Sequence, residues 1–206
     1  MFLGIISIGV TLASTASATI LNFENFYDGH ADYGNIPPGY EGFNWGTNTA
    51  AGWYTKNIGD IMTLTGSSFA SGVIGDVAMY TNFARPISMS RLDNAKFDFN
   101  SVYITSAWNS VSKVAISGWD GAEEKYHSNL EVLNGSPTLF SFDWAGITGL
   151  TLTPVYGYSQ QIIFDNLSIN EPIGSSEPVP EPATMLLMGT GIAGLAASQR
   201  KRLPKK

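Results

Sequence analysis

Cysteine is absent from the 206 residues, histidine occurs only twice, and charged residues make up only 14% of the chain. Without cysteine the chain can form no disulfide framework, thiol nucleophile or cysteine-ligated metal site. The motifs His-Glu-x-x-His and Gly-x-Ser-x-Gly are also missing. The two histidines, His30 and His127, fall in segments that we expect to be loops, where histidine is usually solvated polar surface. The sequence therefore gives little support to catalysis, and we expect the protein not to be an enzyme.

A catalytic pair of carboxylates cannot be identified from the sequence either. Glu123 and Glu124 are adjacent, so on a strand their side chains would point to opposite faces. Glycoside hydrolysis instead needs two carboxyl groups that flank one bond. A repeat of fixed period is also missing, which weighs against a solenoid.

Charge is distributed unevenly along the chain. All 17 acidic residues lie at or before Glu181, together with only six basic residues, so this part has a net charge of six minus 17, or −11. The other five basic residues lie within the last seven positions, at Arg200, Lys201, Arg202, Lys205 and Lys206. Because an acidic body repels nucleic acid and anionic lipid, we expect no nucleic-acid partner.

The first 18 residues have the pattern of a secretory signal peptide. They read MFLGIISIGVTLASTASA, an apolar run followed by small residues with a cleavage site at Ala16 and Ala18. Cleavage after Ala18 would make Thr19 the mature N-terminus. No Lys or Arg precedes the apolar run, which a start codon further upstream would explain. A buried N-terminal strand or a weak membrane anchor is the alternative.

The other end combines a Pro-rich linker, an apolar segment and a basic tail. The linker is 171–182, and it closes with Pro180, Glu181 and Pro182. Its prolines prevent a helix before the apolar segment, 183–198, which would span about 24 Å as a helix against a hydrocarbon core of roughly 30 Å. The basic cluster that follows is Arg200, Lys201 and Arg202. Such a cluster stops transfer, so we expect 183–206 to be a single transmembrane helix with a basic tail. A plain anchor without processing is the alternative.

Together these parts resemble the PEP-CTERM sorting tail. The resemblance covers about residues 177–206 and rests on Val179-Pro180-Glu181-Pro182, on Leu186-Leu187-Met188-Gly189 and on the basic end. In that family Pro-Glu-Pro is recognised by an exosortase, a membrane cysteine protease-transpeptidase. Family databases sometimes name such tails the ice-binding protein C-terminal region, after one kind of protein that carries them.

The resemblance implies a route out of the cell. It implies an exosortase as processing partner, transient contact with the inner membrane, and a tail that is removed after export. Such proteins occur in Gram-negative bacteria that make exopolysaccharide and biofilm matrix. The implied location is therefore the cell envelope, the outer surface or the extracellular matrix. The tail identifies a delivery route and not an activity.

Between the two ends, residues 19–170 alternate apolar and polar side chains in short runs broken by turn residues. Such runs occur at 95–100, 101–105, 113–117, 139–144, 150–154 and 161–169. Period-two alternation predicts strands with one buried face, and no helix is expected between them. Asn134-Gly135 predicts a hairpin that joins 130–133 to 139–144. We therefore predict an all-β domain, a single antiparallel β-sandwich of the jelly-roll kind.

Three segments of this domain also resemble exported bacterial β-sandwich domains that are often joined to such tails. These segments are Leu21-Asn22-Phe23-Glu24, residues 36–45 and Phe164-Asp165-Asn166-Leu167. The architecture is similar to carbohydrate-binding modules of the jelly-roll kind. The resemblance therefore implies that the first and last strands lie together.

Aromatic residues are densest near the N-terminus of the domain. From this cluster we take Tyr40, Trp45 and Trp53 as candidates for glycan binding, because flat rings pack against sugar C–H groups while hydroxyls reach polar neighbours. The alternative is that these rings form the core and plug its loops, since aromatics dominate core energetics. An exposed planar patch would favour binding, and burial of both tryptophans would favour a structural role.

Two acidic residues form a candidate calcium site. If the first and last strands are neighbours, Glu24 and Asp165 could meet at a sheet edge and hold Ca²⁺, which prefers oxygen ligands. Asn166 or backbone carbonyls would complete the shell. The alternative is two separate solvated carboxylates, and no other cofactor is indicated.

These features together predict a non-catalytic exported protein of the cell envelope or exopolysaccharide matrix, with carbohydrate as its expected ligand. A purely structural matrix protein without a ligand is the alternative. A polysaccharide-active enzyme and an ice-binding protein have less support. Ice binding needs a regular array of threonines, and the pairs in Thr63-Leu64-Thr65 and Thr151-Leu152-Thr153 are isolated.

Overall fold

Twelve antiparallel β-strands make up most of the described chain. The computed structural model describes residues 18–26, 32–46, 51–155 and 158–170. They belong to the first of two compact units, residues 1–173, and the second unit is residues 174–206. The expected signal peptide up to residue 17, the linker and the expected transmembrane segment lie outside the described residues. Within the described ranges, no helix is long and apolar enough to cross a membrane.

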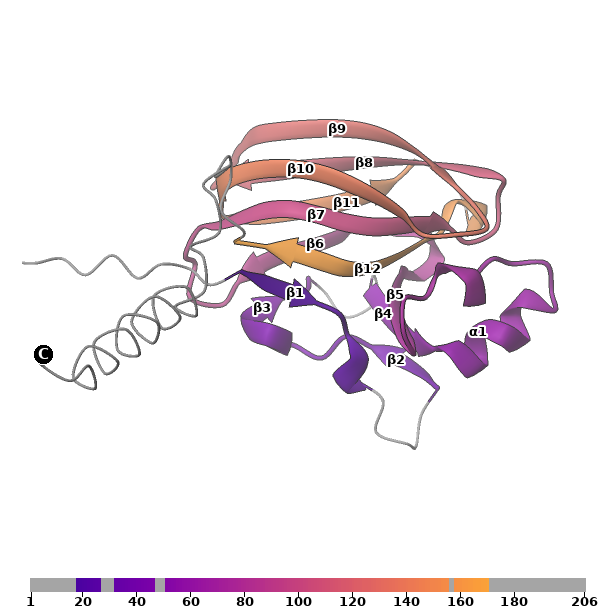
Figure 1. The fold of residues 1–206 in the computed structure, drawn as a ribbon. Coiled ribbons are helices and arrows are strands. Elements are labelled where there is room, and N and C mark those ends of the chain that lie inside the picture. The colour runs from indigo at the N-terminus through magenta and orange to yellow at the C-terminus, as the bar shows by residue number, and fades with distance from the viewer. Residues whose placement is uncertain (1–17, 27–31, 47–50, 156–157, 171–206) are drawn as a thin grey trace, which may run out of the picture. The chain divides into compact units, whose positions relative to one another are not determined.

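The larger of two sheets, sheet A, has seven strands (Figure 1). Its spatial order is β10 (Thr138–Ile147), β7 (Phe97–Ser106), β12 (Ile162–Ile169), β5 (Val77–Thr81), β4 (Ala51–Thr55) and β2 (Tyr33–Asn35). The first strand, β1 (Thr19–Leu21), pairs with the end of β12, with Thr19 opposite Ile169. The first and last strands therefore lie together, as the resemblance implied.

The second sheet, sheet B, has five strands. Its order is β3 (Phe43–Asn44), β6 (Ile87–Arg91), β11 (Gly149–Pro154), β8 (Val111–Asp120) and β9 (Glu123–Leu133). Sheets A and B enclose one large hydrophobic core, to which β6, β8 and β11 contribute Ile87, Met89, Val114, Ile116, Leu150 and Leu152. The prediction of an all-β sandwich is confirmed.

A second, smaller core lies on the opposite face of sheet A. It contains Tyr54, Phe69, Ala78, Ala107 and Ile163. The α-helix α1 (Lys56–Thr63) covers it from outside with Ile58 and Met62 (Figure 1). This helix was not expected from the sequence. Because of it, β4 and most of β5 are buried on both faces.

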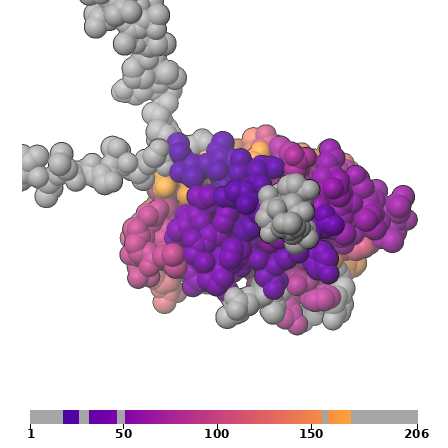
Figure 2. Space-filling view, turned by 90° about the horizontal axis from the view of Figure 1, so that it is seen from below, coloured from indigo at the N-terminus to yellow at the C-terminus, as the bar shows by residue number. Residues whose placement is uncertain are grey.

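Short 3₁₀ helices occupy the connections between the strands. They are η1 (Glu24–Phe26), η2 (Tyr40–Gly42), η3 (Ala70–Gly72), η4 (Asn82–Ala84) and η5 (Tyr158–Gln160). Figure 2 shows one face of the molecule, on which the N-terminal segments, in indigo and purple, form much of the surface. The N-terminal connections thus cover part of the sandwich.

The predicted Asn134-Gly135 hairpin is wrong. Strand β9 pairs with β8 in sheet B, whereas β10 pairs with β7 in sheet A, so the segment with Asn134 and Gly135 crosses from one sheet to the other. The real hairpin joins β8 to β9, where Asp120 pairs with Glu123 across a two-residue loop. That loop begins with Gly121, whose φ of +64° suits the first position of a tight hairpin turn.

Candidate functional site

The aromatic candidates Trp45 and Trp53 lie in the interior. Their exposed fractions are 4% and 8%. Phe26 stacks on Trp53 with ring centroids 5.7 Å apart, and the Trp45 indole donates a hydrogen bond to the backbone oxygen of Tyr40 at 3.1 Å. No planar patch of these two rings faces the solvent, and their burial favours the structural role named as the alternative.

Tyr40, the third candidate, is half-buried against the same cluster. Its ring lies 4.2 Å from that of Phe26, and its hydroxyl donates to Oδ1 of Asn25 at 2.7 Å. Burial raises the pKa of Tyr40 to about 12, and the nearby charge of Glu41 adds to this rise. The ring therefore helps to close the N-terminal connections over the core.

The structure brings Glu24 and Asp165 to the same loop, the one between η3 and β5. Both oxygens of Glu24 accept a hydrogen bond from the backbone N–H of Asp76, at 3.1 and 3.2 Å, and one also accepts from Val77 at 3.4 Å. Asp165 accepts from Ile74 at 2.9 Å. The expected edge location is wrong, because β12 lies inside sheet A with strands on both sides.

These hydrogen bonds to the two carboxylates require a glycine at position 75, between the donors Ile74 and Asp76. The φ of Gly75 is +95°, and a Cβ at this position would collide with Oε1 of Glu24. Any other residue would therefore force the loop away from the carboxylate. The two carboxylates and the loop form one unit, which we call the carboxylate clasp: Glu24, Asp165 and residues 74–77.

Asp165 is fully buried, with an exposed fraction of 0%. Burial raises its pKa from 3.8 to about 7 and outweighs the hydrogen bonds from Ile74 and Asn166, while the negative charge of Glu24 raises it further. A cation between the two carboxylates would remove this repulsion. The pair alone does not complete a site, since no three His, Cys, Asp or Glu in the described ranges are grouped to hold a metal. Calcium binding stays a prediction.

A recess of about 560 Å³ opens where β5 ends and β12 begins. Its lining combines aromatic, amide and hydroxyl side chains, none charged at neutral pH: Met62, Tyr80, Asn82, Phe83, Trp108, Ser159 and Gln161. The volume is within the range of roughly 300–1,000 Å³ that is usual for small-ligand clefts. We call it the aromatic recess.

Hydrogen bonds hold the polar groups of the aromatic recess in place. The indole N–H of Trp108 donates to Oε1 of Gln161 at 2.6 Å, and Nε2 of Gln161 donates to the backbone oxygen of Thr81 at 3.1 Å. The Trp108 ring also packs edge-on against the buried Phe69, with centroids 5.5 Å apart. The ring and its amide neighbour are thus fixed before any ligand arrives.

Phe83 is the most exposed of the aromatic rings in this recess. It keeps an exposed fraction of 55%, and its φ of +55° is followed by +54° at Ala84. Two successive left-handed residues without glycine are costly, and such strain collects at functional sites. Sequence reasoning missed these residues, although Trp108 and Phe83 each lie in a short polar turn between buried strands.

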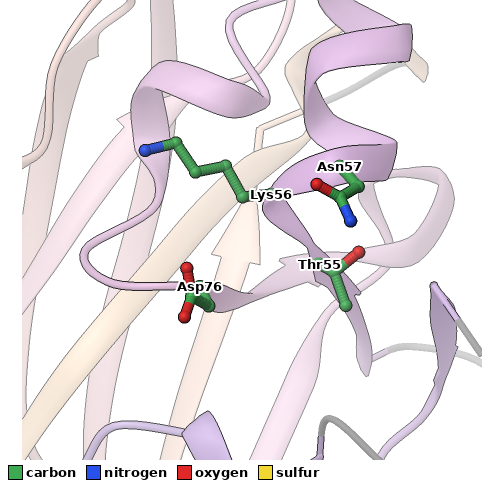
Figure 3. A pocket seen from close by; sticks show the side chains of 4 residues that line it. All are labelled: Thr55, Lys56, Asn57 and Asp76. Atoms are coloured by element: carbon green, nitrogen blue, oxygen red, sulfur yellow. The ribbon is translucent and has the colours of Figure 1, made fainter. Parts of the chain in front are cut away.

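A smaller hollow of about 200 Å³ lies at the junction of β4 and α1 (Figure 3). Thr55, Lys56, Asn57 and Asp76 line it. The backbone N–H of Lys56 donates to the backbone oxygen of Asp76 at 2.7 Å, which ties α1 to the carboxylate clasp. Its volume lies below that of usual ligand clefts, and we assign it no ligand.

His127 lies on β9 and not in a loop as expected, whereas His30 lies outside the described residues. Nδ1 of His127 lies 2.8 Å from Oε1 of Glu124 and 3.1 Å from Oγ of Ser117, both within hydrogen-bond distance. A catalytic relay needs the serine and the carboxylate on different ring nitrogens. The arrangement is therefore a surface hydrogen-bond cluster, and it lowers the pKa of Glu124 through Ser117 first and His127 second.

Comparison with known proteins identifies the C-terminal tail. Residues 178–201 match the PEP-CTERM protein-sorting motif, so the chain carries this motif at its C-terminus. The motif implies an exported, cell-surface protein that is processed by an exosortase. The matched residues, and the expected motif residues from Pro180 to Arg202, lie outside the described residues. No curated protein matches the sequence.

Among solved structures, the chain is similar to a cyclase from Fischerella sp. TAU. The identity is 14% and the TM-score 0.44, over 74% of this chain and 96% of that one. It is also similar to TmCBM61 in complex with beta-1,4-galactotriose, with 9% identity and a TM-score of 0.36, over 65% of this chain and 93% of that one.

Proposed function

We propose that this exported β-sandwich is a non-catalytic glycan-binding protein of the cell envelope or exopolysaccharide matrix. The observation that carries the proposal is the aromatic recess, in which three rings stand beside amide and hydroxyl groups without any charge. Sugars present C–H faces and hydroxyls, and this lining offers a partner for each. The sorting tail supplies the location where such a ligand is abundant.

The expected ligand is a neutral sugar. The part of the chain up to Glu181 has a net charge of −11, so an acidic polysaccharide would be repelled. Each stacked ring contributes about 1 kcal/mol, so a single recess binds weakly, with a Kd near 1 mM, or about −4 kcal/mol. Weak binding becomes useful when many copies share one matrix.

A purely structural matrix protein is the second candidate function. The burial of Trp45 and Trp53 favours it, because these rings are committed to the core. Such a protein would leave the aromatic recess without a sugar ligand. The two candidate functions therefore differ in whether the aromatic recess binds sugar, which can be measured.

Substitutions in the recess test the proposal. The full-length chain, purified in detergent because of its apolar tail, is titrated with neutral hexasaccharides of glucose, galactose, mannose and xylose. We expect at least one to bind, and Phe83→Ala to weaken that binding about fivefold, as the loss of about 1 kcal/mol implies. Trp108→Ala should weaken it at least as much.

Ile20→Ala is the matched control, because Ile20 is an equally exposed apolar residue, 58% against 55% for Phe83, on the distant strand β1. It should leave binding unchanged. If none of the four sugars binds, or if Phe83→Ala and Trp108→Ala bind as well as the unmodified chain, the structural alternative holds.

A further inference from the structure

A second hollow, of about 510 Å³, lies on the outer face of sheet B. It extends over β6, β11 and β8, and its lining carries no charge at neutral pH: Ser88, Met89, Ser90, Asn94, Trp119, Gly121, Thr148, Gly149, Leu150 and Thr151. It thus shares with the aromatic recess a tryptophan, several hydrogen-bonding groups and the lack of charge in an acidic protein. We call it the sheet B hollow.

Strand register explains why this face is hollow. Gly149 of β11 lies between Ser90 of β6 and Trp119 of β8, so short side chains stand next to the large ring. In the next pair along β11, Thr151 lies opposite Ser88. The alternate residues of β11, Leu150 and Leu152, point into the core. The large Trp119 ring therefore lies next to short side chains, most of which are polar, and this difference in size leaves the hollow.

Trp119 is half-buried and held in place by a neighbouring strand. Its indole N–H donates to Oγ1 of Thr151 at 3.1 Å. Asn94 also lines the hollow and offers both donors and acceptors. A fixed aromatic face with hydroxyl and amide groups around it is again the chemistry that fits a neutral sugar.

The two hollows lie at opposite ends of strand β8. Trp108 precedes the start of β8 at Val111, whereas Trp119 lies one residue before its end at Asp120. At about 3.3 Å per residue, the eight steps from Val111 to Trp119 span about 26 Å. A mono- or disaccharide cannot fill both hollows, so they would act as separate sites for such short sugars.

We infer that the sheet B hollow is a second site for neutral sugar chains, so that one molecule holds two chains and cross-links the matrix. This inference rests on the proposed glycan binding. Two weak sites on one rigid body add little to the affinity for a short sugar, but they join long chains that offer many copies of the same unit. The protein would then join polysaccharide chains to one another, rather than only attach itself to one chain.

Indole resonances separate the two sites in one titration. The five tryptophans give indole N–H signals in a ¹⁵N-labelled full-length chain in detergent micelles, and Trp108→Phe and Trp119→Phe assign the two that matter. The probe is the neutral hexasaccharide that binds most tightly. We expect both signals to shift, while those of the buried Trp45, Trp53 and Trp144 stay in place.

Variants on sheet B then isolate the second site. In Trp119→Ala or Ser90→Asp, the sugar should still shift the Trp108 signal, with unchanged affinity. These variants should no longer thicken, that is raise the viscosity of, a solution of a long polysaccharide of the same sugar. Glu131→Gln, on the distant part of β9, should thicken it as the unmodified chain does. The unmoved core indoles report that each variant is folded.

The other outcomes distinguish a failure of glycan binding from a failure of the second site. If no indole shifts with any of the four sugars, glycan binding itself fails. If Trp108 shifts alone, or if Trp119→Ala still thickens the polysaccharide, glycan binding stands and the second site is refuted.

Discussion

At the scale of single residues, the neighbours of a tryptophan decide whether it packs or remains accessible. Trp45 stands in a Gly-rich segment that made it a candidate for exposure, but Phe23 and Phe43 pack within 6.3 Å of its ring. Trp108 lies in the turn between two long strands, where its ring is half-buried and packs edge-on against Phe69. The local sequence around Trp45 and around Trp108 does not reveal which of the two rings is buried.

Asp165 makes a prediction about pH. Its pKa is about 7 in the folded chain, because of burial first, against an ordinary value of 3.8. Between these two values the folded state holds more protons than the unfolded state, so the free energy of unfolding falls as pH rises from about 4 to 7. In EDTA, the melting temperature should therefore be lower at pH 8 than at pH 5. Asp165→Asn should reduce this difference.

Calcium should reverse the effect of pH if the carboxylate clasp holds it. A ligand that binds only the folded state raises its stability, so Ca²⁺ at pH 8 should raise the melting temperature and EDTA should lower it again. The clasp binds no calcium if EDTA leaves melting unchanged and Asp165→Ala behaves alike with and without the ion. If the pH 5 to pH 8 difference is the same in Asp165→Asn, another group titrates.

At the scale of elements, the sequence identified most of the long strands and missed β4 and β5, which are buried on both faces. The runs at 113–117, 139–144 and 150–154 fall within strands of the structure, and 161–169 exceeds β12 by one residue, Gln161. Strands β4 and β5 have no period-two alternation, because α1 and the second core cover the face that would otherwise be polar. Two-sided burial depends on a tertiary contact that a local pattern does not contain.

The break between the predicted runs 95–100 and 101–105 has a structural cause. Residues 97–105 of these runs belong to one strand, β7, whose inward positions change from Phe97 and Phe99 to Val102 and Ile104. Its neighbours β10 and β12 shift register at the same level, and Asp143 and Asn166 there have φ of +50° and +45°. Bulges of this kind bend a sheet. The sequence revealed the change of phase but not the continuous strand.

The candidate sites were predictable only in part, for the same reason. Glu24 and Asp165 could be paired because the resemblance brought the first and last strands together. The aromatic recess joins the end of β5, the turn after β7 and the segment before β12, and the sheet B hollow joins three strands. These residues are far apart in the chain, and no motif connects them.

At the scale of the whole molecule, we propose that each end of the chain serves delivery and that the sandwich serves binding. We expect the mature protein to lack residues 1–18 and the segment after Pro182, because the sequence predicts a signal peptide at the first end and a sorting motif lies at the other. The intact mass of protein taken from the cell surface measures this directly. A mass that still includes residues 183–206 would mean that the tail is a simple anchor.

If neutral sugar contacts hold the exported sandwich in the matrix, free sugar should release the protein and salt should not. Native matrix is washed with 1 M salt, at which the Debye length is about 3 Å, and then with the neutral hexasaccharide that the protein binds. We expect the salt wash to release little protein and the sugar wash to release most of it. Release by salt, with no further release by sugar, would show that charge and not sugar contact holds the protein in the matrix.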